Sequence, residues 1–512
     1  MTLASRLIEP DRVSVSSGAT DLALEQVDVV KRTILFLFVL IYGFYLFLGV
    51  ILLAKANSIS DPDAFWHIAV GRTIWQTGTL PHVDELSHTF RGQPWIANQW
   101  LGQLIFFAAY TLDAWRGVGL LAAAVAALTY TLLFLMLARS MRLTVAVGLA
   151  TTVFVFSLPH FASGRPQIFA DALIVIWVAS LVRSVENRTP PSFMLLPVMT
   201  LWANVHGSFT FGLAIAGALA VEAFFSSPAD QRFRTAGRWA TFLVAALGFA
   251  CITPYGFQPI LTTLQVFVGN DAVNYIGEWR PATPETLGID GPILLGLLFL
   301  ALYRGVKLPL WRLLWIIGLV FLMFTHIRFA ALFAIVAPLL LVTPLTKQFP
   351  FLRLSTQIAT EPSFFNAMAR ASKRFLYPVC ILMVAGVAAF AAFGPPMAPA
   401  RKLSPTGAVD YIQREHLSGN IYNPYNFGGY LIFRGIKTFV DGRTDQLFTG
   451  GFATRLYDAV DQNPRKFIAY LMAYNVSIAI VVPNSREAQE LSRAAGWQKV
   501  YSDDVSELFQ ER

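Results

Sequence analysis

The sequence predicts a polytopic α-helical membrane protein that carries a small α/β domain at its C-terminus. Of the 512 residues, 55% are hydrophobic and only 14% are charged, and the mean hydropathy is +0.55. A soluble domain carries about a quarter charged residues. Apolar runs of about 17–25 residues, the length of a membrane-spanning helix, recur along most of the chain and stop before a more polar C-terminal stretch.

The net charge of +8 does not indicate nucleic-acid binding. The Arg and Lys residues stand at the ends of apolar runs, and no polar segment carries a basic stripe interleaved with aromatics. That placement is typical of basic residues that anchor helix ends on the cytoplasmic side. Both cysteines, Cys251 and Cys380, lie inside apolar runs, so they predict neither a disulfide nor a metal site.

The N-terminal segment, residues 1–32, predicts a cytoplasmic start rather than a cleavable signal peptide. Lys31 and Arg32 precede the first apolar run, residues 33–54. A basic pair before the first span keeps the N-terminus in the cytoplasm. The run is too long for the apolar region of a signal peptide and has no small-residue cleavage site, so we expect a signal anchor.

A large first outer loop, residues 55–116, contains a semi-apolar piece at residues 98–115. If this piece crossed the membrane, the basic residues of every later loop would face outward. The positive-inside rule therefore favours an interfacial helix on the membrane surface. Its Gln and Trp content and its end at Asp113 suit the same interpretation.

The later apolar runs bring the total to about eleven spans, within a transmembrane domain of residues 33–394. The C-terminus then lies outside, and the compact loops fit the inner membrane of a bacterium. Residues 395–512 alternate helix-like pieces (407–415, 465–474, 486–495) with strand-like ones (438–441, 477–482), which predicts a periplasmic α/β domain. The later spans are expected at residues 117–138, 145–159, 167–183, 193–203, 208–225, 239–253, 290–303, 310–325, 329–345 and 376–394.

With this topology, ionisable and polar residues gather at helix ends on the outer membrane face. Such a collection, contributed by several loops, predicts a functional cavity. In chain order the candidates are Asp61, Asp63, Trp66, His67, Arg165, Asn204, His206, Glu278, Arg280 and Arg328.

Several of these residues also have simple structural interpretations. Asp61 or Asp63 can cap the helix that follows, because an aspartate before a helix accepts backbone N–H bonds. Phe65 and Trp66 are most simply anchors at the membrane interface. These structural roles do not exclude a catalytic one.

The basic candidates differ in the same way. His206 can be a satisfied helix-end histidine, although Gly207 beside it allows close backbone approach. Arg328 can snorkel to the interface. Arg165 lies in a Gly-Arg-Pro turn that holds its backbone rigidly, so it is the better candidate for binding a phosphate.

Two segments resemble a known superfamily. The first loop reads DPDAFWHIAVGR, and the tail reads NFGGYLIFRGIKTFVDGRTDQLF. Together with the pattern of spans, they look like bacterial GT-C glycosyltransferase-type membrane proteins, whose first loop has paired tryptophans where this chain has Phe65 and Trp66. The Trp-Trp-Asp signature of oligosaccharyltransferases is absent, which disfavours transfer of a whole glycan to protein asparagine.

The resemblance implies transfer of a sugar from a polyprenyl-phosphate carrier on the outer face, with inversion, to a glycan, lipid or protein acceptor. A sugar hydroxyl needs a carboxylate to take its proton, and a lipid phosphate leaves at headgroup depth, where Asp61 and Asp63 are expected. We favour Asp63, because Asp61 before a proline suits the cap. The expected phosphate and donor ligands are Arg165, His206, Arg328, Arg280 and His67, and the expected acceptor or accessory residues are Glu278, Trp66 and Asn204.

A divalent metal, Mg or Mn, could bridge Asp61, Asp63 and the phosphate; the sequence leaves this open. Two other functions also remain open, a transporter or flippase and a non-catalytic scaffold. A transporter would carry an inverted repeat or interrupted spans, and neither is visible. The acids nearest to mid-span are Asp171 and Glu222.

Overall fold

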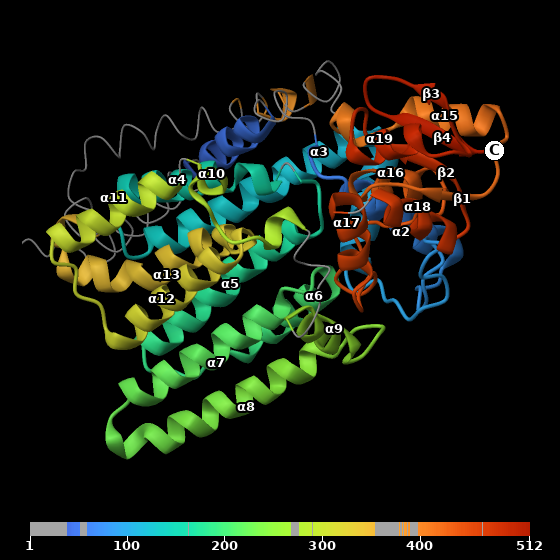
Figure 1. Ribbon diagram of the computed structural model, residues 1–512. Helices are drawn as coiled ribbons and strands as arrows, with labels where there is room; N and C mark the ends of the chain where they lie inside the picture. The colour runs from blue at the N-terminus through green and yellow to red at the C-terminus, as the bar shows by residue number, and fades with distance from the viewer. Residues whose placement is uncertain are drawn as a thin grey trace, which may run out of the picture. The chain divides into compact units, whose positions relative to one another are not determined.

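A computed structural model describes residues 38–51, 59–161, 163–267, 276–288, 290–353, 398–462 and 464–512, with scattered positions between 378 and 389 (Figure 1). The predicted N-terminal segment, the start of the first span, Cys380 and most of the predicted last span lie outside these residues. The chain divides into two compact units, Met1–Phe44 with Ser355–Gly394, and Tyr45–Leu354 with Pro395–Arg512. The second unit holds the candidate site.

The helical part of this unit follows the predicted spans closely. Helix α3 packs against α4 and α5, α5 packs against α7 and α13, and α7 packs against α8 (Figure 1). The helices are α3 (Trp100–Ala138), α4 (Leu143–Phe161), α5 (Gln167–Glu186), α6 (Leu196–Val205), α7 (Phe209–Ser226), α8 (Arg232–Ala250), α9 (Gln258–Phe267), α10 (Pro284–Leu287), α11 (Asp290–Tyr303), α12 (Leu310–Thr325) and α13 (Ala330–Gln348).

Four helices of the described residues are long and apolar enough to cross a membrane: Trp100–Ala138, Gln167–Glu186, Phe209–Ser226 and Ile327–Gln348. Shorter apolar helices occur at Phe38–Ile51, Leu143–Ser157, Phe193–Val205, Gly291–Tyr303 and Leu310–Thr325. The predicted total of about eleven spans therefore stays a prediction.

Helix α3 contains a break where the predicted surface piece ends. Asp113 and Ala114 have non-helical backbone angles, and Ala114 has a φ of 44°. The Asp113 carboxylate accepts a hydrogen bond from Arg116 Nε at 2.5 Å. At Gly117 an added Cβ would lie 2.0 Å from the Ala109 carbonyl oxygen. Glycine is therefore needed for the close approach of the two helical parts.

Alternating helix directions bring the candidate residues to one end of the bundle. His160 ends α4, Arg165 precedes α5, His206 follows α6 and Arg328 precedes α13. Because neighbouring helices run in opposite directions, residues far apart in sequence meet there.

The opposite helix ends carry a separate buried ion pair. Arg312 of α12 donates from Nε to Glu222 of α7 at 2.6 Å and from Nη1 to the Leu340 carbonyl of α13 at 3.2 Å. Glu186 Oε1 of α5 lies 3.7 Å from Arg312 Nη2. Glu222, an acid that the sequence leaves near mid-span, thus has a structural partner that joins four helices.

The tail forms a four-stranded sheet with helices around it, as predicted. The strand order is β1-β2-β4-β3, with β1 parallel to β2 and the other pairs antiparallel. The predicted helices 407–415, 465–474 and 486–495 and the strand 477–482 are confirmed. The elements are α15 (Thr406–Arg414), β1 (Asn420–Tyr422), α16 (Tyr425–Phe433), α17 (Phe452–Gln462), α18 (Pro464–Ala473), β2 (Val476–Val481), α19 (Arg486–Arg493), β3 (Trp497–Ser502) and β4 (Glu507–Glu511).

The predicted strand at residues 438–441 is wrong. Thr438 makes only an isolated bridge, to Ser87 of the first loop. Its N–H donates to the Leu86 carbonyl at 3.0 Å, and its carbonyl accepts from the His88 N–H at 3.0 Å. Thr438 therefore pairs its backbone N–H and carbonyl with the first loop instead of joining the sheet.

The first loop and the tail share hydrophobic cores. Helix α2 (Asp63–Thr77) places Phe65 in a cluster with Leu431 and Ile478, and Trp66 in a second cluster with Phe439. Phe65 and Trp66 are 2% and 6% exposed. The sequence suggests that they are membrane-interface anchors. The structure shows instead that they bind the loop to the tail.

Helix α16 lies unusually close to its neighbours because of two glycines. A Cβ at Gly429 would lie 2.1 Å from the Pro62 carbonyl oxygen, and one at Gly428 would lie 2.4 Å from the Val440 carbonyl oxygen. Gly429 thus allows backbone contact with the Asp-Pro-Asp segment, and Gly428 allows contact with the segment before Gly442.

Candidate active site

The two acids of the first loop stand at the start of α2. Asp61 precedes the helix, and its Oδ1 accepts a hydrogen bond from the Asp63 N–H at 2.9 Å. Asp63 is the first helical residue and is only 5% exposed. Asp61 therefore has the capping role expected of it, and each acid keeps an oxygen for another partner.

That partner is Arg165, which contacts three carboxylates at once. Its Nε lies 3.1 Å from Asp61 Oδ2, its Nη1 lies 3.0 Å from Asp63 Oδ2, and its Nη2 lies 2.5 Å from Glu278 Oε2. Each nitrogen of the guanidinium thus has a carboxylate of its own. The contact joins residues separated by about a hundred positions on either side of the arginine, a grouping that the sequence alone does not predict.

Glu278 extends the cluster to a second arginine. Its Oε1 lies 3.4 Å from Arg328 Nη1, and the Arg328 guanidinium lies over the Trp279 ring at 4.2 Å. The Trp279 carbonyl contacts His326 Nδ1 at 2.6 Å. The two short helices that carry these residues, η4 (Gly277–Trp279) and η5 (Ile327–Phe329), therefore hold one another in place.

The acids of the cluster differ in protonation. Burial and the nearby Asp61 carboxylate raise the pKa of Asp63 to about 8, and burial also raises the pKa of Asp61. Burial acts to raise the pKa of Glu278 as well, but Arg165 and Arg328 outweigh it and lower that pKa to about 2. Asp63, with Asp61 beside it, can therefore exchange a proton near neutral pH, while Glu278 stays ionised.

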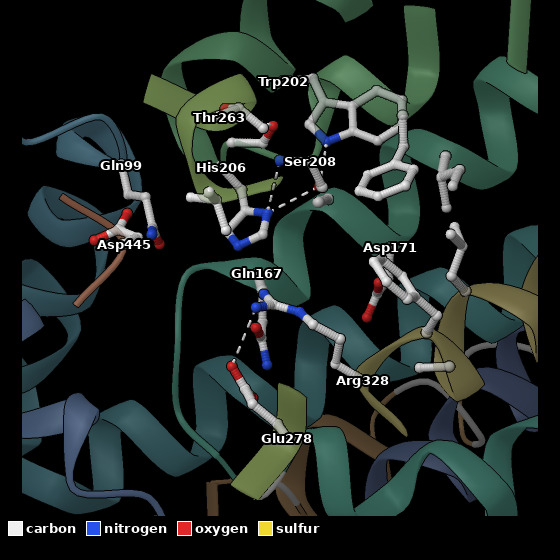
Figure 2. Close-up of a pocket in the computed structure, with 18 of the residues that line it drawn as sticks. Gln99, Gln167, Asp171, Trp202, His206, Ser208, Thr263, Glu278, Arg328 and Asp445 are labelled. Atoms are coloured by element: carbon white, nitrogen blue, oxygen red, sulfur yellow. Dashed lines mark hydrogen bonds and ion pairs between the residues drawn. The ribbon is translucent and has the colours of Figure 1, made fainter. Parts of the chain in front are cut away.

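A cavity of about 190 Å³ opens beside this cluster (Figure 2). Glu278, Arg328 and His206 reach it from different elements, and Asp445 of the tail lies at its far side. Its lining includes the apolar side chains of Ile174, Phe211, Val266, Phe329 and Leu332, which we call the apolar wall, beside the polar Gln167 and Asp171 of α5.

His206 is held as a neutral ring. Burial and the Arg328 charge lower its pKa to about 3. Its Nδ1 accepts the Ser208 N–H at 3.2 Å and contacts the Ser208 hydroxyl at 2.8 Å. A neutral imidazole whose Nδ1 accepts carries its proton on Nε2, so His206 can donate one hydrogen bond into the cavity.

Of the predicted site residues, only His206, Glu278 and Arg328 line this cavity. Asp61, Asp63 and Arg165 lie in the cluster beside it, and four others lie elsewhere. His67 is buried, its pKa is held well below the usual range by burial, and its Nδ1 contacts Gln103 Nε2 at 3.2 Å. The Asn204 side chain accepts a hydrogen bond from Trp100 and donates to the Thr200 and Ile252 carbonyls.

Trp66 packs in the core and stacks on His67 at 3.7 Å. Arg280 is exposed and lines another cavity.

That second cavity has a volume of about 350 Å³ and lies between the Gly277–Trp279 helix and the tail. Three tyrosines line it, Tyr422, Tyr425 and Tyr457, together with Arg280 and Glu487. Tyr425 is close enough to Asp63 and Asp61 for their charges to contribute, after burial, to raising its pKa. Residues of the loop that carries Glu278 therefore line both cavities.

Three further acid or histidine residues line the first cavity without a site role predicted from the sequence: His160, Asp171 and Asp445. His160 Nε2 lies 2.9 Å from Asp171 Oδ2, and its Nδ1 contacts Gln167 at 3.3 Å. Asp445 comes from the tail motif Asp-Gly-Arg-Thr-Asp, which the sequence marks as unusual without indicating what it faces. Its position depends on the packing of the tail, which no local pattern reveals.

The tail motif itself supports the first loop. Arg443 is fully buried between Asp84 Oδ1, at 2.6 Å, and Asp441 Oδ2, at 2.8 Å. Its guanidinium also lies over the Trp95 ring at 4.9 Å. Gly442, between Asp441 and Arg443, lies against Asp63, since a Cβ there would stand 1.8 Å from Asp63 Oδ1.

The arrangement does not fit a divalent metal at Asp61 and Asp63. A metal would need their free oxygens to converge on one point at about 2.0–2.6 Å. Here Asp61 Oδ2 and Asp63 Oδ2 each pair with a different nitrogen of Arg165. Among the described residues, no group of three or more His, Cys, Asp or Glu side chains could hold a metal ion.

Neither family models nor curated protein sequences give a match to this chain. Solved structures do. The oligosaccharyltransferase AglB from Archaeoglobus fulgidus, in complex with an inhibitory peptide and a dolichol-phosphate, is 12% identical with a TM-score of 0.54, over 87% of this chain and 69% of that chain. The apo form of an oligosaccharyltransferase from the same organism is 13% identical with a TM-score of 0.51, over 86% and 69%.

A third structure, the arabinofuranosyltransferase AftD from Mycobacteria, is 13% identical with a TM-score of 0.48, over 93% of this chain and 40% of that chain. The two oligosaccharyltransferase structures confirm the GT-C glycosyltransferase-like fold that the sequence predicts. At this level of identity the likeness concerns the fold.

Proposed function

We propose that the protein is a membrane glycosyltransferase that transfers a sugar from a polyprenyl-phosphate donor to a hydroxyl acceptor, with inversion. One observation carries the proposal. Asp63 is a buried acid whose proton exchanges near neutral pH. It belongs to a cluster that continues through Arg165 and Glu278 to Arg328. This cluster lies at the edge of the cavity with the apolar wall.

The cavity with the apolar wall suits the donor. A polyprenyl phosphate combines an anionic head with a long apolar tail, and the lining offers a counterpart to each. Arg328 and the Nε2–H of His206 would bind the phosphate, and Ile174, Phe211 and Leu332 would contact the first isoprene units.

The tyrosine-lined cavity suits the acceptor. Aromatic faces stack on sugar rings, and Tyr422, Tyr425 and Tyr457 lie around one space. An acceptor held there would approach the cluster from the side opposite to the phosphate, as an inverting displacement requires.

The reaction then involves one bond formed and one broken at the anomeric carbon. The acceptor oxygen forms a bond to that carbon, and the bond from the carbon to the phosphate oxygen breaks. Asp63 takes the proton of the acceptor hydroxyl, and the lipid phosphate leaves with the electron pair. Arg328 stabilises the charge that grows on the phosphate. Arg165 keeps the Asp63 carboxylate oriented.

We further propose that the chain resides in a bacterial inner membrane, with its N-terminus cytoplasmic and its C-terminal domain periplasmic. Its partners would be the bilayer, a lipid-linked sugar and a cell-envelope glycan, lipid or protein.

A release assay tests the proposal. Purified protein in detergent is incubated with a panel of polyprenyl-phosphate sugars, with and without candidate glycan acceptors. We expect free lipid phosphate to appear only when a suitable acceptor is added. Uptake of a substrate into sealed vesicles without chemical change would instead indicate a transporter and would contradict the proposal.

The pH dependence of transfer should follow the ionisation of Asp63. A general base must be deprotonated, and with a pKa of about 8 only about a tenth of Asp63 is ionised at pH 7. We expect kcat/KM to rise about tenfold from pH 7 to a plateau above about pH 9. A profile that is flat across this window would assign the base to another group.

Replacing Gly442 by alanine should impair transfer although the residue lies in the tail. The added Cβ would overlap Asp63 Oδ1 and come within 2.8 Å of Trp66 Nε1. A displacement of about 1 Å at a reacting group can cost about 10²-fold, so we expect kcat to fall by that order. Gly237→Ala is the matched control, because Gly237 faces open space in α8. Equal rates in both variants would show that Gly442 does not position the acid.

A further inference from the structure

We infer that Arg165 is the built-in cation of this site, and that the carboxylates of Asp61, Asp63 and Glu278 serve a guanidinium instead of a divalent metal. The inference rests on the proposed function for the reaction that the site serves. The geometry of the cluster carries it independently of the substrates.

The three carboxylates surround a guanidinium, whose donors point outward in one plane from a rigid fork. Asp63 and Glu278 accept hydrogen bonds from Nη1 and Nη2 at 3.0 and 2.5 Å, and Asp61 forms an ion pair with Nε at 3.1 Å without hydrogen-bond geometry. A metal demands the reverse arrangement, in which oxygens converge on one centre.

The backbone holds Arg165 in this position. Gly164 has a φ of 64°, and a Cβ there would lie 3.3 Å from Ile59 Cγ2. Pro166 caps α5, and its ring packs so closely on α3 that a Cβ at Gly102 would lie 2.6 Å from Pro166 Cβ. A tight turn fixed on both sides restricts the movement that Arg165 would need to clear the site for a metal.

The charges of the cluster are nearly balanced without a further cation. Arg165 and Arg328 supply two positive charges, and Asp61, Asp63 and Glu278 supply three negative ones when all are ionised. An additional dication would find little uncompensated negative charge.

Arg165 also orients the Asp63 carboxylate, as a metal ion would otherwise do. Arg165 contacts Asp63 through Oδ2, and Gly442 lies against Oδ1. The carboxylate is thus fixed without metal coordination. Stabilisation of the leaving phosphate falls to Arg328, which lines the donor cavity.

Manganese binding, measured by electron paramagnetic resonance on purified protein without any substrate, tests the inference. The wild-type protein should show no Mn²⁺ binding that is lost on Asp63→Asn. Arg165→Ala removes the guanidinium that holds the three carboxylates apart, so their side chains can turn toward one point, and the variant should gain one Mn²⁺ site. Adding Asp63→Asn to Arg165→Ala should weaken that site at least about tenfold, since one of its anionic ligands is lost.

Arg328→Ala is the matched control, because it removes an arginine from the cluster and leaves Arg165 in place; we expect no gain of Mn²⁺ binding. Wild-type protein that binds one Mn²⁺ and loses it on Asp63→Asn would overturn the inference, and this comparison holds even if Arg165→Ala fails to fold. A folded Arg165→Ala protein that gains no site would also contradict it. Where transfer is detected, EDTA should change the wild-type rate less than twofold, whereas a protein without transferase activity would refute only the proposed function.

Discussion

Replacing Asp63 by asparagine should lower the rate of sugar transfer by about 10²–10⁴-fold, the contribution typical of a positioned general base. The change should leave folding intact. Asp63 has a pKa of about 8 and is mostly protonated at neutral pH, so an amide of nearly the same shape replaces a neutral acid. The rate is measured by acceptor-dependent release of lipid phosphate, and folding by the apparent unfolding midpoint in detergent.

Asp61→Asn is the control for this experiment. Asp61 uses one oxygen on the Asp63 N–H and the other on Arg165, and an asparagine oxygen can keep one of these bonds. We expect a loss of within about tenfold, because one hydrogen bond contributes about 0.5–1.5 kcal/mol. A wild-type rate in Asp63→Asn, or a larger loss in Asp61→Asn, would move the base away from Asp63.

Replacing Arg443 by methionine should destabilise the protein by about 3–5 kcal/mol, because it leaves two buried carboxylates without their partner. Asp84, Asp441 and Arg443 are all fully buried, and they join the first loop to the tail. The loop carries Asp61 and Asp63, so activity should fall with stability. The apparent unfolding midpoint and the rate of proteolysis between loop and tail measure the effect.

Arg401→Met provides the comparison at the surface. Arg401 pairs with Asp504 at 3.0 Å, but its side chain is 80% exposed. Such pairs contribute less than about 1 kcal/mol, so the midpoint should hardly move. If Arg443→Met and Arg401→Met unfold at the same temperature, the buried triad does not hold the loop to the tail.

The helices were predictable because their signal is local. An apolar run long enough to span a bilayer is visible in the sequence itself, and the expected spans 167–183, 208–225 and 310–325 correspond to α5, α7 and α12. The break of α3 at Asp113 was also readable, since an acid interrupts the apolar pattern there. The tail helices α15, α18 and α19 followed from their periodicity for the same reason.

The partners within the site were less predictable because they are distant in sequence. Asp63 and Arg165 are individually visible as unusual residues, and the predicted topology places both on one membrane face. That one guanidinium binds three carboxylates depends on how α2, α5 and the Glu278 loop meet. No local pattern distinguishes this arrangement from a metal site on the same acids.

The role of the tail was the hardest to foresee. Phe65 and Trp66 look like interface anchors next to a span, yet they are buried against tail residues more than 350 positions away. Residues 438–441 look like a strand because they are β-branched and apolar, yet their backbone groups bind the first loop. Burial between distant segments outweighed local propensity in both places.

The most direct test of the account is the position of a donor analogue that cannot be cleaved, determined by cryo-electron microscopy of the wild-type protein. The account predicts its phosphate at Arg328 and His206, in the cavity of Figure 2, with the sugar directed toward Glu278 and Asp63. A phosphate bound elsewhere, for example at the opposite helix ends near Arg312, would contradict it.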